Sequence, residues 1–290
     1  MSLIKTIPEL EAWLDTMGRH GRTLGFVPTM GCLHAGHLSL IKAARAQNDL
    51  VVASVFVNPT QFAPGEDYEN YPRDIGRDYA LAREAGADAV FNPRAAEIYI
   101  PGASTAVEVT GEITKKLCGA SRPTHFKGVT TVVNILFNLI RPDRAYFGQK
   151  DAQQALIVKK MVRDLHMPVE VVVCPIVREA DGLAMSSRNV YLSPEERRQA
   201  VCLNEALGKA EEYAASGAAS STSAARLTEI MESHINSRSL AVIDYVRVLD
   251  SETLADIAAI APGQKALAAV AVKFGKTRLV DNRVLPVGRR

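Results

Sequence analysis

Hydrophobic positions in the N-terminal part of the chain follow two alternating patterns. Short apolar runs that end at glycine or polar residues, such as LVVASVFV over residues 50–57, predict buried strands. Longer segments between them, such as HLSLIKAARAQ over residues 37–47, space their apolar residues as a helix does. The N-terminal stretch MSLIKTIPELEAWL is predicted to be the first helix. Further strands are predicted over residues 23–29, 89–92, 144–147 and 169–173, and further helices over 78–86, 129–139 and 152–165.

The alternation of strands and helices predicts an α/β fold. Strands joined through helices run mostly parallel, and the connecting helices cover both faces of the sheet. The pattern then changes, and apolar runs over residues 243–249, 266–274 and 278–280 predict a small antiparallel sheet. We therefore expect two domains, a larger α/β domain over residues 1–176 and a smaller C-terminal α+β domain over residues 177–290.

Composition and charge exclude several classes of protein. The chain has 290 residues, of which 47% are hydrophobic and 23% charged, an ordinary balance for a globular protein. Its formal net charge of +2 provides no bulk attraction for nucleic acid. No apolar run reaches the roughly 18 residues that a membrane span requires, and the N-terminus lacks the apolar core of a signal peptide. We therefore expect neither a nucleic-acid partner nor a membrane partner.

The four cysteines, Cys32, Cys118, Cys174 and Cys202, lie far apart along the chain. Because no C-x-x-C pair is present, neither a disulfide framework nor a cysteine zinc site is expected. Reduced thiols are the natural interpretation, and they indicate a cytoplasmic location.

Ligands of parallel α/β sheets bind at the carboxyl ends of the strands, which here places residues 29–37, 58–61 and 147–151 on one rim. The strongest chemical pattern on this rim is His34-Ala35-Gly36-His37, which follows a strand and opens a helix. Gly36 lets a ligand approach the backbone, and a helix N-terminus attracts anions. The two imidazole groups can donate to phosphate oxygens, so the motif indicates a phosphate site.

Two other interpretations of this motif stay open, because short motifs are weak by themselves. The histidines could simply pack at the helix start or cap it. They could also bind a metal, but a metal site needs further His, Cys or carboxylate ligands, and none lies nearby at useful spacing. We therefore expect no tightly bound zinc.

The arrangement of strand, HxGH and helix resembles the nucleotidyltransferase superfamily that includes class I aminoacyl-tRNA synthetases. The longer string PTMGCLHAGHLSL is similar to the pantothenate synthetase family. Four further strings follow in that family's order and spacing, so the resemblance covers about residues 20–200 by motif. It implies a Rossmann-like N-terminal domain and a C-terminal domain that acts as a lid. The four strings are VNPTQF (57–62), RPTHFKGV (122–129), FGQKDAQQ (147–154) and MSSRN (185–189).

The resemblance implies an AMP-forming ligase that makes an amide bond. ATP would activate (R)-pantoate as a pantoyl-adenylate, and β-alanine would displace AMP to give pantothenate. Mg²⁺ is expected with the ATP, and the family implies a homodimer. Two alternatives are another HxGH-type adenylyl- or cytidylyltransferase, which would lack the pantoate strings, and a non-catalytic nucleotide-binding module.

The resemblance also implies roles for individual residues that contact ATP. His34 and His37 would contact the phosphates, and Lys150 would offset charge as pyrophosphate leaves. These three are the expected catalytic residues. Taken without the motifs, Lys150 would be an ordinary surface lysine, and Asp151 would be a helix N-cap. The expected ATP-binding residues are Met30, His34, His37, Gly148, Lys150, Asp151, Val177, Met185, Ser186, Ser187 and Arg188.

A second set of residues is implied for pantoate. Gln61, Gln154 and Asn58 would bind its hydroxyl and carboxylate oxygens, because an amide offers both a donor and an acceptor. Met30 and Phe62 would line the apolar side of the pocket, or else belong to the core. Asp78 is a candidate magnesium ligand. The alternative interpretation is that it is an ordinary exposed acid on the surface of a helix. Arg122 and His125 lie in a matched string, and the sequence assigns them no role.

Overall fold

The computed structural model describes residues 1–18, 21–62, 68–216, 222–261 and 263–286. The chain divides into two compact units. The first unit comprises Met1–Gln149 and Gln154–Pro175. The second comprises Lys150–Gln153 and Ile176–Arg290. The short segment with the predicted catalytic lysine is therefore grouped with the C-terminal part of the chain.

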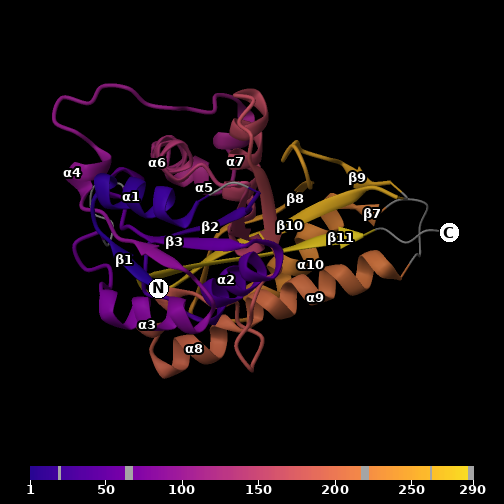
Figure 1. The fold of residues 1–290 in the computed structure, drawn as a ribbon. Coiled ribbons are helices and arrows are strands. Elements are labelled where there is room, and N and C mark those ends of the chain that lie inside the picture. Colours follow the sequence, from indigo (N-terminus) through magenta and orange to yellow (C-terminus); the bar gives the residue numbers. More distant parts are fainter. Residues whose placement is uncertain (19–20, 63–67, 217–221, 262, 287–290) are drawn as a thin grey trace. The chain divides into compact units, whose positions relative to one another are not determined.

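A six-stranded parallel sheet forms the centre of the first unit (Figure 1). The strand order is β1-β4-β3-β2-β5-β6, and every neighbouring pair is parallel. This sheet confirms the α/β fold predicted from the alternating apolar patterns. The strands are β1 (Ser2–Ile4), β2 (Leu24–Thr29), β3 (Leu50–Val55), β4 (Ala89–Phe91), β5 (Arg144–Gly148) and β6 (Glu170–Cys174).

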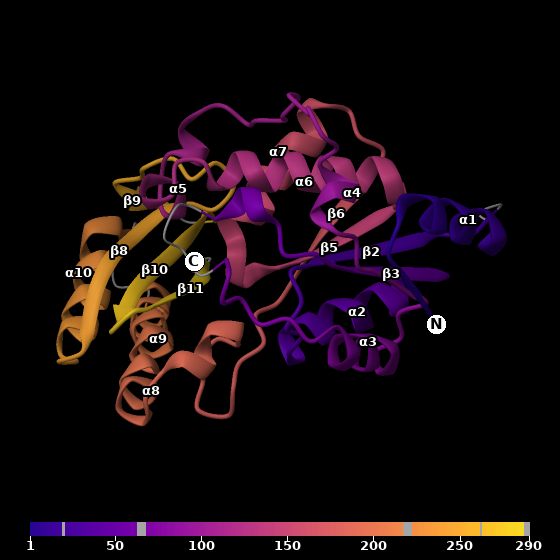
Figure 2. The ribbon, with the colours of Figure 1, turned by 90° about the vertical axis from the view of Figure 1, so that its left-hand side faces the viewer.

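Helices cover both faces of this sheet (Figure 2). The helices α2 (Ala35–Gln47) and α3 (Ile75–Glu84) lie on one face, and α6 (His125–Ile140) and α7 (Ala152–Asp164) lie on the other. All six residues of β3 are buried, as expected for a strand that is covered on both sides. The shorter elements of this unit are α1 (Ile7–Met17), η1 (Pro59–Gln61), α4 (Ala95–Ile98), η2 (Glu112–Thr114), α5 (Cys118–Ser121) and η3 (Gln149–Asp151).

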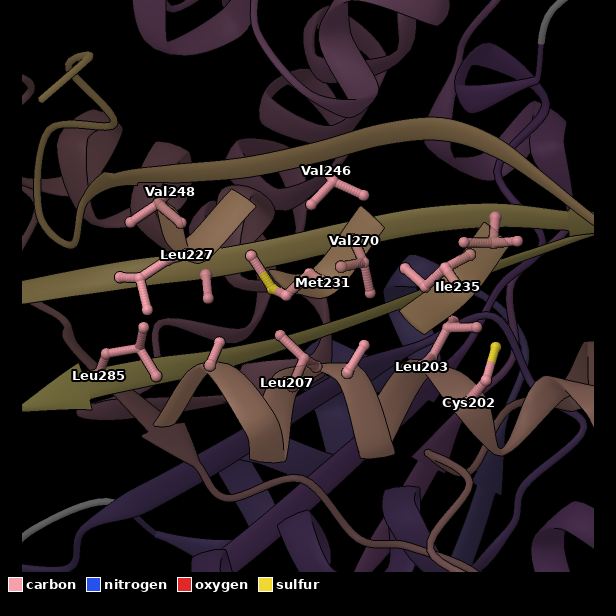
Figure 3. Packing of buried hydrophobic residues seen from close by; sticks show 14 of the residues in the cluster. Cys202, Leu203, Leu207, Leu227, Met231, Ile235, Val246, Val248, Val270 and Leu285 are labelled. Atoms are coloured by element: carbon pink, nitrogen blue, oxygen red, sulfur yellow. The ribbon is translucent and has the colours of Figure 1, made fainter. Parts of the chain in front are cut away.

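The second unit is built on an antiparallel sheet with the order β11-β10-β8. Alternate residues of β10, such as Val270, face helices α9 and α10 and form a hydrophobic core with Leu207 and Met231 (Figure 3). Phe274 belongs to the same core. This period of two is the alternation of a β-strand, and the intervening residues, such as Leu267 and Ala271, are buried as well. The elements are η4 (Ser187–Tyr191), α8 (Pro194–Ala200), α9 (Cys202–Ala215), β7 (Thr222–Ser223), α10 (Ala224–Asn236), β8 (Ala241–Asp250), β9 (Ala259–Ile260), β10 (Lys265–Phe274) and β11 (Thr277–Pro286).

Local signals in the sequence explain where several helices begin. Thr6 caps α1 by accepting the Glu9 N–H, while the Glu9 carboxylate accepts the Thr6 N–H. Ser193 and Glu196 form the same reciprocal pair at the start of α8. Each pair satisfies backbone N–H groups that the first turn of a helix leaves without a partner.

Two predicted elements are corrected by the structure. The N-terminal stretch does not begin with a helix, because Ser2–Ile4 forms strand β1 on the edge of the sheet beside β4. Three residues are too few to show a strand period in sequence. The helix expected from residue 78 begins earlier, at Ile75, since Asp74 accepts the Arg77 N–H as its N-cap. Asp78 therefore lies in the first turn of α3.

None of the helices in the described part of the chain is both long enough and apolar enough to cross a membrane.

Candidate active site

His34 and His37 lie together at the start of α2. His34 is the N-cap residue, and its Nδ1 accepts the Gly36 N–H at 3.1 Å. Because a backbone N–H can only donate, Nδ1 carries the lone pair, and a neutral His34 ring has its hydrogen on Nε2. The two imidazole rings stack with their centroids 4.0 Å apart. The capping alternative is thus correct for Nδ1 of His34.

Asp78 supports the loop that precedes these histidines. Its carboxylate oxygens accept the Cys32 N–H at 2.8 Å and the Leu33 N–H at 2.7 Å. Its side chain is 1% exposed, so the alternative of an exposed helix acid is wrong. Burial raises the pKa of Asp78, and the two backbone hydrogen bonds oppose that shift. Both oxygens are engaged by the backbone, and the magnesium role stays a prediction.

Gly31 allows this support. Its φ of +85° lies in the region that L side chains rarely adopt. A Cβ atom at this position would lie 2.8 Å from Asp78 Oδ2 and 2.9 Å from Val55 Cγ1. This glycine, which precedes the HxGH motif, therefore lets the carboxylate reach the next two amides.

Asn58 and Gln61 form a buried amide pair after β3. Asn58 is 1% exposed and Gln61 is 9% exposed. Asn58 Nδ2 donates to Gln61 Oε1 at 3.0 Å and to the Gly128 carbonyl at 3.2 Å. Of the other residues predicted for pantoate, Gln154 is half-buried in α7, and Met30 is half-buried after β2. Phe62 packs its ring against Tyr68 and Tyr71.

The structure shows contacts of Arg122 and His125, two residues without a role assigned from the sequence. Arg122 Nη2 donates to the Gln61 carbonyl at 3.0 Å, and His125 Nδ1 lies 2.9 Å from the same oxygen. Since that oxygen can only accept, Nδ1 is the protonated nitrogen of His125. Both side chains thus hold the main chain at Gln61, a residue predicted to bind pantoate. A bond to a backbone carbonyl has no sequence signature, which is why these contacts were missed.

The end of β5 leads into the predicted lysine. Gly148 is the last residue of β5, and a Cβ built on it meets nothing within 4 Å, so a ligand can approach the backbone there. Lys150 and Asp151 follow in η3, with Lys150 Nζ 3.9 Å from Asp151 Oδ1. Asn282 Nδ2 from β11 donates to the Lys150 carbonyl at 3.0 Å. Asn282 lies in the part of the chain that carries no family string, so sequence reasoning missed it.

Residues Val177 to Arg188 form a closed loop in the second unit. The Met185 N–H donates to the Val177 carbonyl at 3.0 Å, and Ser186 caps η4 by accepting the Arg188 N–H at 3.3 Å. Arg178 anchors the loop through a two-point contact with the buried Asp281, at 2.6 and 3.0 Å. Ser186, Ser187 and Arg188 are all half-buried, so Arg188 is not the fully exposed arginine of a plain surface turn.

The described residues contain no group of three or more His, Cys, Asp or Glu side chains that could hold a metal ion. Mg²⁺ commonly binds through substrate phosphates with one or two carboxylates, and it needs no such cage. The described residues therefore fit a magnesium ion that is held mainly by the phosphates of ATP.

Known proteins resemble this chain over nearly its whole length. A family model described as pantoate-beta-alanine ligase matches residues 2–284. A pantothenate synthetase of Acetivibrio thermocellus is 54% identical over 287 residues, which is 99% of this chain and 100% of the relative.

Two solved structures agree with the sequence comparison. A pantothenate synthetase from Thermus thermophilus superposes with a TM-score of 0.91 at 49% identity, covering 98% of this chain and 99% of its own. A pantoate-beta-alanine ligase from Francisella tularensis, complexed with beta-gamma ATP and beta-alanine, gives a TM-score of 0.80 at 32% identity. That comparison covers 98% of this chain and 97% of the other.

Proposed function

The chain belongs to the pantoate–β-alanine ligase family, and we propose on that premise how its residues divide the work of catalysis. The enzyme is an ATP-dependent ligase that joins pantoate to β-alanine. A carboxylate is a poor electrophile, so its oxygen must first acquire a better leaving group. Pantoate oxygen attacks the α-phosphorus of ATP, the bond to the β-phosphate oxygen breaks, and pyrophosphate leaves.

In this first step the protein positions the reactants and disperses negative charge. We assign His34 and His37 to the phosphates, because both lie at the start of α2, where a helix attracts anions, and the Gly36 N–H places the hydrogen of a neutral His34 ring on Nε2. This geometry is the observation that carries the assignment. Lys150 and the segment Ser186–Arg188 supply further positive charge and hydroxyl donors to the triphosphate. Met30, Gly148, Asp151, Val177 and Met185 complete the proposed nucleotide contacts.

In the second step β-alanine attacks the acyl carbon of the adenylate as a neutral amine. The amide bond forms, the acyl carbon–oxygen bond to AMP breaks, and the amine loses a proton. No protein nucleophile is required. We assign Gln61 and Gln154 to pantoate, which they hold through hydrogen bonds that add no charge. Asn58 belongs to the same site, where its buried amide donates to Gln61 Oε1.

Mg²⁺ is proposed to enter with ATP on the phosphates, where it would neutralise charge on the leaving pyrophosphate. We also propose a homodimer, by analogy with the family, and a cytoplasmic location. The four cysteines are free thiols, and two of them are partly exposed, which fits a reducing compartment. Light scattering during size-exclusion chromatography would test the dimer.

The function is tested by omitting one substrate at a time. AMP release should require both pantoate and β-alanine, whereas exchange between ATP and labelled pyrophosphate should require pantoate alone. Exchange without pantoate would point to another nucleotidyltransferase activity. Exchange that strictly required β-alanine would contradict a free adenylate intermediate.

A further inference from the structure

The orientation of the buried Asn58 amide is fixed by two backbone groups. Its Oδ1 lies 3.3 Å from the Thr60 backbone nitrogen, and its Nδ2 lies 3.2 Å from the Gly128 carbonyl oxygen. A backbone N–H can only donate and a carbonyl can only accept, so the oxygen and nitrogen of this side chain cannot be exchanged. Asn58 therefore has one defined donor side and one defined acceptor side.

This orientation determines the orientation of Gln61. Asn58 Nδ2 also lies 3.0 Å from Gln61 Oε1, and a donor on Asn58 requires an acceptor on Gln61. The oxygen of the Gln61 amide is thus engaged inside the protein. Its Nε2 makes no hydrogen bond with the described residues, and Arg122 and His125 hold its main chain. The group that Gln61 can offer to a ligand is the NH₂ donor.

Tyr99 stabilises this arrangement from a different part of the chain. It is the C-cap of α4, and its hydroxyl donates to Asn58 Oδ1 at 2.7 Å. Thr60 Oγ1 lies 3.0 Å from the same oxygen and 3.1 Å from the Tyr99 hydroxyl. Burial raises the pKa of Tyr99, so the hydroxyl keeps its proton and remains a donor at neutral pH. Donors therefore surround the acceptor side of Asn58.

We propose that Tyr99 and Asn58 are positioning residues that hold the Gln61 amide with its nitrogen toward pantoate. This inference rests on the proposed binding of pantoate by Gln61. The Gln61 NH₂ group can then donate to a ligand atom with a lone pair, such as a carboxylate or hydroxyl oxygen. It disfavours a ligand group that can only donate, such as an ammonium. A glutamine that could rotate freely would accept either kind of group.

The hydrogen-bond chain from Tyr99 through Asn58 to Gln61, called the relay below, can be tested by removing the Tyr99 hydroxyl, a small change with little risk to the fold. Tyr99→Phe should raise the KM for pantoate by about two- to tenfold, the scale of one hydrogen bond, with the KM for ATP unchanged. Tyr79→Phe is the matched control, because the Tyr79 hydroxyl donates to the Met1 carbonyl at 2.6 Å, outside the network. It should leave the KM for pantoate unchanged.

Asn58→Asp replaces the donor that faces Gln61 with an acceptor, which reverses the direction of the hydrogen bond between the two side chains. Two carboxylate oxygens can only accept, so Gln61 must turn its nitrogen inward and present Oε1 to pantoate. We expect a rise of about tenfold or more in the KM for pantoate, larger than for Tyr99→Phe. The new carboxylate also faces the Gly128 carbonyl, so the Tm of this variant is measured first. If it does not fold, the result from Tyr99→Phe decides.

A double-mutant cycle separates positioning from general structure. If Tyr99 acts through Gln61, Tyr99→Phe should have no further effect on kcat/KM for pantoate in a Gln61→Ala background, measured in single turnovers. Additive effects of Tyr99→Phe and Gln61→Ala would overturn the relay, and so would equal changes in KM for ATP and for pantoate. Either result leaves the proposed function intact, because the wild type still forms AMP. Absence of pantoate-dependent AMP formation in the wild type would overturn the proposed function, and the relay with it.

Discussion

At the residue scale, His34 shows how one side chain serves the fold and the proposed chemistry together. Nδ1 caps α2, and Nε2–H is the donor assigned to ATP. Removal of the whole side chain would therefore mix a loss of helix stability, typically about 1 kcal/mol, with a loss of catalysis. A useful substitution must separate these two contributions.

His34→Asn makes that separation. Asparagine is among the best N-cap residues, so the Tm should change little. The imidazole donor is lost, and the rate of adenylate formation should fall by about 10²-fold or more, the scale of one preorganised donor. Single-turnover adenylate formation and thermal unfolding together check the prediction. A folded variant with a near wild-type rate would contradict the phosphate role.

Asp78→Asn tests whether the buried carboxylate supports the loop or binds metal. An amide offers one acceptor oxygen, so the Cys32 or Leu33 N–H would lose its partner at a cost of about 1–3 kcal/mol of unfolding free energy. Adenylate formation should slow, because the loop that precedes His34 loses part of its support. The dependence of the rate on Mg²⁺ concentration should stay unchanged.

The control for this substitution lies on the same helix. Asp74→Asn keeps an N-cap acceptor for the Arg77 N–H and should be nearly neutral. An Asp78 variant that keeps its stability but needs more Mg²⁺ would favour the magnesium role instead.

At the scale of elements, the sequence predicted most of the parallel sheet, because long apolar periods and glycine turns are local signals. It placed the HxGH string correctly at the end of β2 and the start of α2. It missed the burial of Asp78, since an acid in a helix is usually exposed. It also missed Tyr99 and Asn282, because their partners are distant in sequence, and such contacts arise only when the chain folds.

The contact between α6 and η1 depends on Gly128. A Cβ atom there would lie 2.3 Å from the Thr60 carbonyl oxygen, so Gly128→Ala must displace backbone. We expect a loss of about 1–3 kcal/mol in unfolding free energy and a higher KM for pantoate, since Asn58 also bonds the Gly128 carbonyl. Gly76→Ala in α3 is the control, because its nearest atom would be 3.6 Å away. Denaturant unfolding measures both variants.

At the scale of the whole molecule, the second unit has its own hydrophobic core, and Cys202 reports on it. This thiol is 1% exposed at the start of α9, and burial raises its pKa to about 12. The unfolded thiol ionises near its ordinary pKa of 9.0. The neutral buried thiol therefore contributes fully to the free energy of unfolding below pH 9. This contribution is lost as the pH rises from 9 toward 12.

The loss should amount to about 1.4 kcal/mol of unfolding free energy for each pH unit in this window. Cys202→Ala should flatten this alkaline slope, although the smaller side chain lowers stability at neutral pH. Denaturant midpoints between pH 8 and 10.5 check the prediction. Parallel slopes in the two proteins would show that Cys202 does not contribute.

The hydrogen bond from Asn282 to the Lys150 carbonyl joins positions 132 residues apart. During synthesis the chain emerges in order, at roughly 5–20 residues per second, so Lys150 leaves the ribosome about 7–26 seconds before its partner does. All six strands of the parallel sheet are made by residue Cys174, well before β11 exists. A nascent chain can therefore complete the first sheet while Lys150, the proposed catalytic lysine, still lacks its hydrogen bond from the last strand.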